Sequence, residues 1–210
     1  MGFTGVWVVA ALPDTELARL PEADELFVPP VEVGGERTWW EEVHERGRAG
    51  RGTRRLWEDE DADRLGRLIG GWYGETGPAE EFRGAVMGQL EGWGPEPEPE
   101  WFFAAVARKA FPFGALAYGV GPGAVLALPG WFGEFVLTAD QVRERLPEFE
   151  AALEWSGEER ERVLDRLRAW LADLGDAPDH PAEELLDGPL RVARWAAARG
   201  WGLVGVAPVY

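Results

Sequence analysis

The pattern of hydrophobic and polar positions predicts a strand at each end of the chain, with amphipathic helices between them. Residues 3–12 contain the apolar run Val-Trp-Val-Val, which is rich in β-forming side chains and ends at Pro13. Residues 201–210 form a second apolar, strand-like segment. We therefore expect an α+β fold with a small mixed or antiparallel sheet, in which the last strand joins the first. Several amphipathic helices should pack on this sheet, and the C-terminal half should be helical.

Helix signals are strongest in the C-terminal half. Thr138 with Gln141 and Ser156 with Glu159 have the spacing of capping boxes, so a helix should follow each of them. The second of these helices carries apolar residues at spacings of three and four and should end near residue 175. Its apolar face consists of Val163, Leu164, Leu167, Trp170, Leu171 and Leu174. A third helix is expected to start at Pro189 and to bury Val192, Trp195 and Ala196, with Gly200 past its end.

The N-terminal half gives further helix signals. Thr38 and Glu41 match the capping-box spacing, which predicts a short helix from residue 39. Acidic residues 58–63 precede apolar positions at helical spacing, which predicts a second helix ending near residues 70–74. Pro78 should begin a third helix, with Phe82, Ala85, Val86 and Leu90 on one face.

The stretch 101–138 carries only three formal charges, on Arg108, Lys109 and Glu134. Because ionised groups are rarely buried without a partner, this stretch is expected to form the centre of the sheet and core. We predict a helix over 101–110 and two strands, over 115–120 and 124–128, joined by a Gly-Pro-Gly turn. A further strand is expected over 131–137.

The chain length of 210 residues favours a single globular domain over 1–210. The best candidate for an internal boundary is the Pro/Glu tract at 94–100, where prolines alternate with glutamates. Such a tract is extended and stiff, but it does not by itself divide the chain into two domains.

Composition excludes several function classes. The chain has no cysteine, which excludes disulfide scaffolds and thiol chemistry, and its only serine, Ser156, is expected to cap a helix. No GxSxG or phosphate-binding glycine motif occurs. Asp59, Asp61 and Asp63 resemble the start of a calcium loop, but Arg64 stands where that loop needs its glycine. We therefore expect no metal and no cofactor.

The net charge of −17 disfavours direct binding to nucleic acid, because it repels the phosphate backbone. Five arginines between residues 46 and 55 are the only candidate basic patch, and they are expected to neutralise neighbouring acids. The acidic surface suits a protein partner with a basic surface. No signal peptide or membrane span is recognisable, so a cytoplasmic location is expected. The frequent arginine, alanine, glycine and proline are typical of a GC-rich bacterial genome.

The twelve tryptophans are the unusual feature of the chain. Trp170 and Trp195 lie on apolar helical faces and are expected in the core. Other aromatic residues occur among polar residues and glycines, where Trp and Tyr often anchor protein interfaces. The predicted binding surface consists of Trp39, Trp40, Glu41, Glu42, His44, Trp72, Tyr73 and Trp93.

Two functions follow from these observations. The first is a non-catalytic acidic protein that binds another protein, such as an immunity protein, an antitoxin-like protein or a regulatory accessory protein. The alternative is an enzyme or small-molecule binder with a tryptophan-lined pocket, in which His44 with Glu41 or Glu45 would act as acid-base group or as metal ligands. The other histidine, His180, is expected in a loop or at a helix entry. Its distance from His44 does not follow from the sequence.

Overall fold

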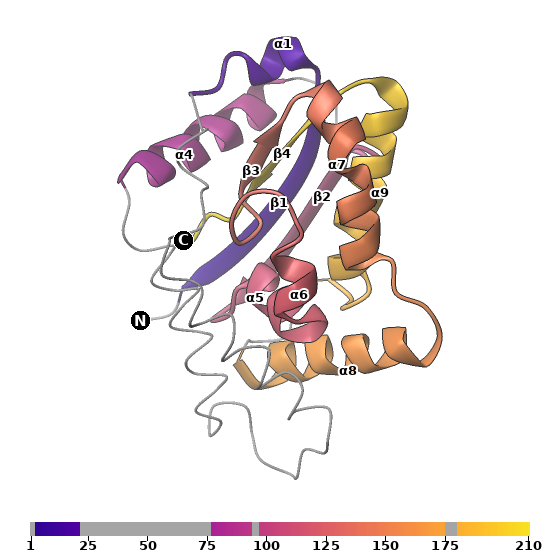
Figure 1. Cartoon of the computed structure of the whole chain (residues 1–210). Coiled ribbons are helices and arrows are strands. Elements are labelled where there is room, and N and C mark those ends of the chain that lie inside the picture. Colours follow the sequence, from indigo (N-terminus) through magenta and orange to yellow (C-terminus); the bar gives the residue numbers. More distant parts are fainter. Residues whose placement is uncertain (1–2, 22–76, 94–96, 175–179) are drawn as a thin grey trace.

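A computed structural model describes residues 3–21, 77–93, 97–174 and 180–210. The described residues form one four-stranded antiparallel sheet and seven helices, which confirms the predicted α+β class and the helical C-terminal half (Figure 1). The helices expected from residue 39 and behind the acidic residues 58–63 lie outside the described residues.

The sheet has the strand order β2-β1-β4-β3. Its two central strands are the first and last of the chain, β1 (Thr4–Leu12) and β4 (Gly202–Val206), and they pair with each other, as the sequence predicts. The two edges are β2 (Phe102–Arg108) and β3 (Phe135–Leu137). An isolated bridge between Gly5 and Val209 continues the pairing of β1 with the end of the chain.

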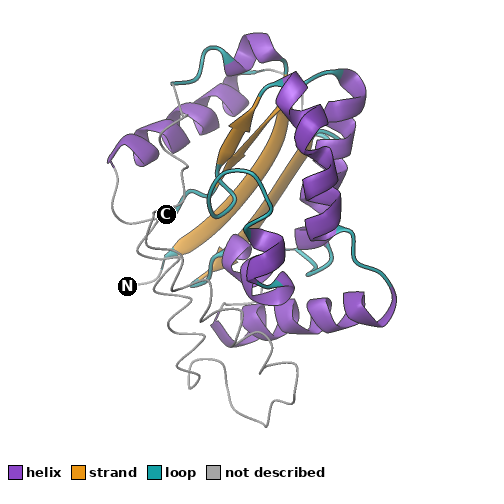
Figure 2. Cartoon of the chain, in the orientation of Figure 1, coloured by secondary structure: helices purple, strands orange, loops and turns teal. Residues whose placement is uncertain are grey.

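Helices surround this sheet, as Figure 2 shows. Their bounds are α1 Asp14–Leu17, α4 Gly77–Gly92, α5 Pro112–Val120, α6 Pro122–Val125, α7 Ala139–Leu153, α8 Gly157–Leu174 and α9 Glu184–Arg199. None of these helices is long and apolar enough to span a bilayer.

One face of the sheet packs on α5, α7 and α9. Trp7 of β1 meets Phe113 of α5 edge-to-face, with ring centroids 5.0 Å apart. Phe135 of β3 meets Phe149 of α7 in the same way at 5.7 Å. On α9, Gly188 lies against the ring of Phe103, where a Cβ atom would come within 2.2 Å of Cδ2. Burial of these large apolar rings is the main contribution to the core.

The opposite face of the sheet is also buried along its centre. Val8, Leu12, Val204 and Val206 are at most 2% exposed, and α4 lies on this side of the sheet (Figure 1). The helix α8 packs instead under α5, where Leu167 fills the space above Gly119. The sheet is therefore the middle layer of the described fold.

The prediction for residues 101–128 was wrong in its secondary structure. Residues 101–110 contain strand β2 rather than a helix, and 115–120 and 124–128 lie in and after helices α5 and α6 rather than in strands. β2 alternates buried and exposed positions with the period of a strand, which the uniformly apolar sequence conceals. Prolines occupy the first turns of α5 and α6, where a missing N–H costs nothing.

This stretch therefore supplies the two edges of the sheet and part of the core, but not the centre of the sheet. The predicted strand over 131–137 is shorter than expected, because residues 131–134 form a tight turn before β3. Pro189 lies inside α9 rather than at its start, since α9 begins five residues earlier at Glu184.

Candidate interaction surface

Four tryptophans from separate segments gather at one end of the sheet. Trp93 follows α4, Trp101 precedes β2, Trp195 lies in the last turns of α9, and Trp201 precedes β4. The ring of Trp93 meets Trp101 at a centroid distance of 5.0 Å and Trp201 at 5.4 Å, and Trp201 meets Trp195 at 5.0 Å. All three contacts are edge-to-face, the favourable geometry for aromatic pairs. We call these four residues the tryptophan cluster.

A proline turn places Trp101. The amides of Trp101 and Phe102 both donate to the Glu98 carbonyl, at 3.2 and 2.9 Å. Pro99 occupies the second position of this turn, where its fixed φ is favourable. The Arg191 side chain of α9 donates from Nε to the Pro99 carbonyl at 2.9 Å. The end of the Pro/Glu tract is thereby attached to the same helix that carries Trp195.

A helix end places Trp195 and Trp201 against each other. Gly200 follows α9 in the left-handed conformation, with φ of 67°, and the Trp201 amide donates to the Ala196 carbonyl at 3.0 Å. This is the hydrogen bond of a Schellman motif, which is often accompanied by an apolar contact across the turn. The Trp195–Trp201 pair is that contact. The guanidinium of Arg199 lies 4.6 Å from the centre of the Trp195 ring, within the range of a cation–π interaction.

The tryptophan cluster is only partly shielded from solvent. Trp101 is buried, whereas the other three rings are half-buried. Glu91, Glu98 and Glu100 flank the cluster in sequence; all three are exposed, and none forms an ion pair in the described part of the chain. The surface therefore combines accessible aromatic rings with carboxylates that have no basic partner among the described residues.

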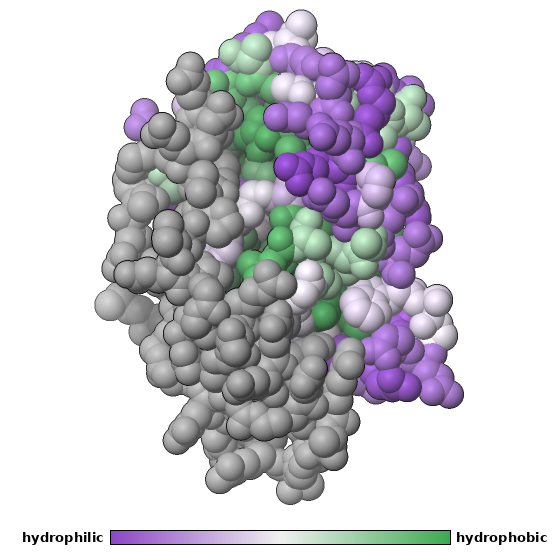
Figure 3. All heavy atoms as spheres, in the orientation of Figure 1, coloured by the Kyte–Doolittle hydropathy of each residue, from purple (hydrophilic) through white to green (hydrophobic). Residues whose placement is uncertain are grey.

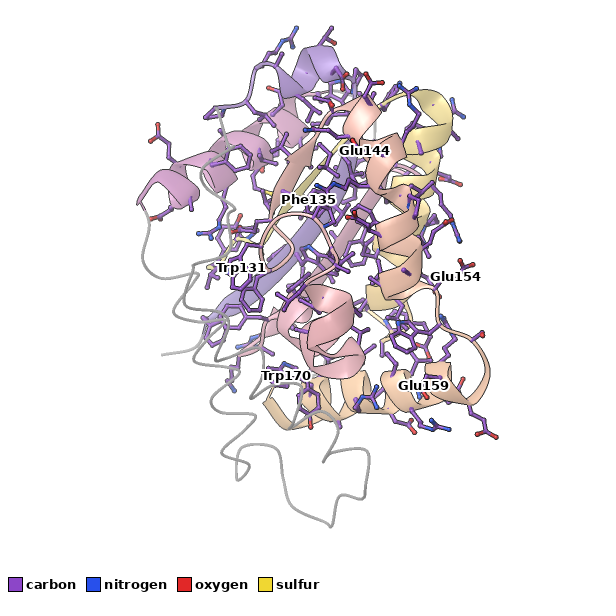
Figure 4. All side chains as sticks on the ribbon, viewed as in Figure 1. Trp131, Phe135, Glu144, Glu154, Glu159 and Trp170 are labelled. Atoms are coloured by element: carbon purple, nitrogen blue, oxygen red, sulfur yellow. The ribbon has the colours of Figure 1, made fainter. Side chains whose placement is uncertain are left out.

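On α7, α8 and α9, unlike beside the tryptophan cluster, most charged side chains are paired, because most arginines there form ion pairs with Asp or Glu. Arg160 makes a bidentate pair with Asp187 at 3.0 and 2.7 Å, and this hydrogen bonding raises the pKa of Arg160. Arg194 contacts both Glu150 and Glu154. Figure 3 shows hydrophilic side chains covering this side of the molecule, and Figure 4 labels Glu154 at its α7–α8 connection. These pairs provide solubility rather than a basic patch.

One ion pair is buried in the described core. Arg83 of α4 contacts Glu134 through two hydrogen bonds of 2.5 and 2.7 Å, and the Glu134 side chain is fully buried. The Ala207 amide also donates to Glu134 Oε1 at 3.1 Å. This arrangement satisfies a buried carboxylate from two sides and fixes α4 to the end of the sheet. We interpret it as a structural contact.

An apolar pocket lies beside the turn at residues 130–133. Its lining includes Phe113, Leu128, Trp131 and Phe132, and its volume is about 20 Å³. Among the described residues that line it, none has a titratable side chain, and so none of them offers an acid-base group or metal ligand. Trp131, one of its lining residues, is labelled in Figure 4. A cavity of this size holds about one water molecule.

The structure describes one residue of the predicted binding surface, Trp93, and places it inside the tryptophan cluster. The other predicted site residues lie outside the described residues: Trp39, Trp40, Glu41, Glu42, His44, Glu45, Trp72 and Tyr73. His180 is half-buried shortly before α9, at a helix entry. Within the described ranges, no group of three His, Asp or Glu residues is arranged to hold a metal ion.

Sequence reasoning missed three members of the cluster, and it expected Trp195 in the core, whereas this ring is half-buried. A local signal for one contact was present. Trp195 and Trp201 flank Gly200 at the spacing of a Schellman motif, which predicts their contact. The meeting of Trp93 with Trp101 and Trp201 depends on the placement of α4 and the strand order, which no local pattern encodes.

Comparison with known proteins gives no relative for this chain: no family model matches, and no similar curated protein or solved structure was found. Function is therefore inferred from the chain's own residues. The tryptophan cluster and its flanking carboxylates are the feature of the described structure that best fits a binding role.

Proposed function

We propose that this chain is a non-catalytic acidic binding protein whose partner is another protein with a basic surface. Immunity proteins, antitoxin-like proteins and regulatory accessory proteins are examples of this class. The observation that carries the proposal is the tryptophan cluster, in which half-buried rings stand beside Glu91, Glu98 and Glu100, which form no ion pair with any described residue.

Physical chemistry supports such a surface as a contact site. Tryptophan is enriched among the residues that contribute most to binding, because a large rigid ring buries much area at little entropic cost. Lysine or arginine side chains of a partner would lie on the indole rings and pair with the carboxylates. The contact of Arg199 with the Trp195 ring, at 4.6 Å, supports this mode of binding, because it is the same kind of cation–π interaction within the chain.

The overall negative charge of the chain also supports a basic protein partner. A net charge of −17 attracts a basic partner over a distance and repels nucleic acid. We propose a cytoplasmic protein that makes no direct contact with nucleic acid or membrane. The residues predicted around His44 would extend the same binding surface.

The alternative, an enzyme or small-molecule binder, depends on His44 with Glu41 or Glu45. A single substitution separates the two functions. For a binding protein, His44→Ala removes one side chain of a larger surface, so most of the partner capture remains. For an enzyme that uses this histidine, the same substitution abolishes turnover.

A pull-down from the native host tests the proposal. The bait is the wild-type chain, compared with the double variant Trp93→Ala/Trp195→Ala and with Trp155→Ala. Trp155 is also half-buried, but it donates to the Ala152 carbonyl at the end of α7 and lies outside the cluster. Mass spectrometry should identify a basic protein that the wild type and Trp155→Ala capture, that the double variant loses, and that added salt releases. Equal recovery by all three baits, or no recovery by any, contradicts the proposal.

A further inference from the structure

The ring of Trp195 already carries a guanidinium group from its own helix. Arg199 lies about one turn further along α9, and its guanidinium carbon is 4.6 Å from the centre of the Trp195 ring. Residues four positions apart lie on one face of a helix, so α9 itself brings the two side chains together. Arg199 is also the basic residue in the last turn of α9, where the helix dipole favours a positive charge. The end of α9 therefore suits a guanidinium group.

Arg199 is held in this position by a weak contact. Its side chain is exposed, and it forms no ion pair with any described residue. Arg191 and Arg194 of the same helix, by contrast, both pair with carboxylates. A cation–π contact at an exposed site contributes little free energy, so a ligand displaces Arg199 at little cost.

The carboxylates beside the tryptophan cluster suit an arginine better than a lysine. Glu91, Glu98 and Glu100 are exposed and form no ion pair with any described residue. A planar guanidinium group can stack on an indole ring while its N–H groups donate paired hydrogen bonds to a carboxylate. A lysine ammonium is a compact, strongly hydrated charge and lacks this geometry. Aromatic rings next to carboxylates therefore favour arginine.

We propose that the tryptophan cluster recognises an arginine side chain of the basic partner, and that this arginine replaces Arg199 on the Trp195 ring. The inference rests on the proposed function and adds the chemical group that the cluster binds. Arg199 is then an internal competitor, because it occupies the ring and repels the incoming cation. Its removal should tighten binding, whereas removal of the ring should weaken it.

The first test compares two peptides by titration calorimetry. One is a short glycine-spaced arginine peptide, and the other has lysine at every arginine position, so length and charge are equal. The wild type should bind the arginine peptide at least about threefold more tightly. Trp195→Ala should remove this preference, and Trp155→Ala, outside the cluster, should keep it. Equal affinities in the wild type, a preference that persists in Trp195→Ala, or no binding of the arginine peptide overturns the inference.

The second test removes the internal competitor. Arg199→Gln should bind the arginine peptide about two- to fivefold more tightly than the wild type, which corresponds to the loss of one exposed cation–π contact. Arg162→Gln removes the same charge from α8, which contacts the start of α9 rather than its end, and should change the affinity little. Binding by Arg199→Gln that equals the wild type or is weaker overturns the inference.

The inference and the proposed function fail in different ways. Suppose that capture of the protein partner depends on Trp93 and Trp195, but Arg199→Gln does not bind that partner more tightly. The proposed function then stands, and the replacement of Arg199 is wrong. If Trp93→Ala/Trp195→Ala captures the partner as well as the wild type does, the proposed function fails and this inference fails with it.

Discussion

The indole ring of Trp201 stands edge-on against Trp195, with centroids 5.0 Å apart, because Gly200 turns the chain back at the end of α9. The contact has two consequences. The turn ends the helix with the Ala196 carbonyl accepting from the Trp201 amide. It also places two aromatic rings, one from each side of the turn, on one surface. The stability of the helix end and the shape of the tryptophan cluster therefore depend on the same glycine.

Substitution of Gly200 tests this dependence. A Cβ at this position meets nothing within 4 Å, so any cost of Gly200→Ala comes from the positive φ alone. We expect a loss of about 1–2 kcal/mol in the free energy of unfolding, measured by urea denaturation. Gly200→Asn should cost less, because asparagine tolerates the left-handed region. Equal stability of wild type and Gly200→Ala would show that the turn does not determine the helix end.

The buried pair Arg83–Glu134 gives a second prediction. Arg83→Ala leaves the fully buried Glu134 carboxylate without its guanidinium, which should lower the free energy of unfolding by about 3–5 kcal/mol. Replacing both residues, as Arg83→Met/Glu134→Leu, should recover most of this loss, because apolar side chains of similar size need no partner. The recovery should be incomplete, since the Ala207 amide also loses its acceptor. A double variant as unstable as Arg83→Ala would contradict the structural interpretation.

The start of α7 gives a third prediction. Thr138 and Gln141 form the capping box that the sequence predicts, with reciprocal hydrogen bonds between side chain and backbone. Asp14 adds a second cap from a distant segment, because its Oδ1 accepts from the Ala139 amide at 2.9 Å. Thr138→Ala should cost about 1 kcal/mol of stability in thermal denaturation, and Thr138→Ser, the matched control, much less. A similar loss in both variants would show that the hydroxyl hydrogen bond is not responsible.

Acid pH should weaken the contact between α8 and the start of α9. A hydrogen bond from its own backbone and the Arg168 guanidinium lower the pKa of Glu183. A carboxyl group whose folded pKa is lowered stabilises the fold above its unfolded pKa, and this contribution disappears as the pH falls through the folded pKa. The difference in Tm between wild type and Arg168→Gln should therefore be largest near neutral pH and vanish in acid.

The size of this effect is limited by solvent, because both side chains are more than one third exposed. The Glu183→Gln background provides the control, in which Arg168→Gln should have an effect independent of pH. A pH-dependent effect of Arg168→Gln in that background would assign the titration to another group.

The sequence was informative where local rules act alone. The capping box at Thr138, the amphipathic face of α8 and the two terminal strands follow from short patterns, and the structure confirms them. The stretch 101–128 is different, because an apolar run without clear periodicity fits a buried helix and a buried strand equally well. Pro112 and Pro122 were the overlooked signals, since proline is favoured in the first turn of a helix.

The candidate surface was less predictable than the fold. The polar surroundings of Trp93 in the sequence predict a binding residue, and the structure places its ring in contact with Trp101 and Trp201. These two neighbours lie one hundred residues apart in the chain, so their meeting is a consequence of the strand order β2-β1-β4-β3. A local sequence pattern does not predict tertiary contacts of this kind.

We propose that the tryptophan cluster and its carboxylates bind a basic protein. The most direct measurement is the dissociation constant of the purified partner for wild type, Trp93→Ala and Trp155→Ala, by titration calorimetry at about 0.05 and 0.3 M salt. We predict that Trp93→Ala weakens binding about 30-fold or more, as removal of a central interface tryptophan does, that Trp155→Ala changes it little, and that salt weakens binding to the wild type. Equal dissociation constants for Trp93→Ala and wild type, or binding insensitive to salt, would contradict it.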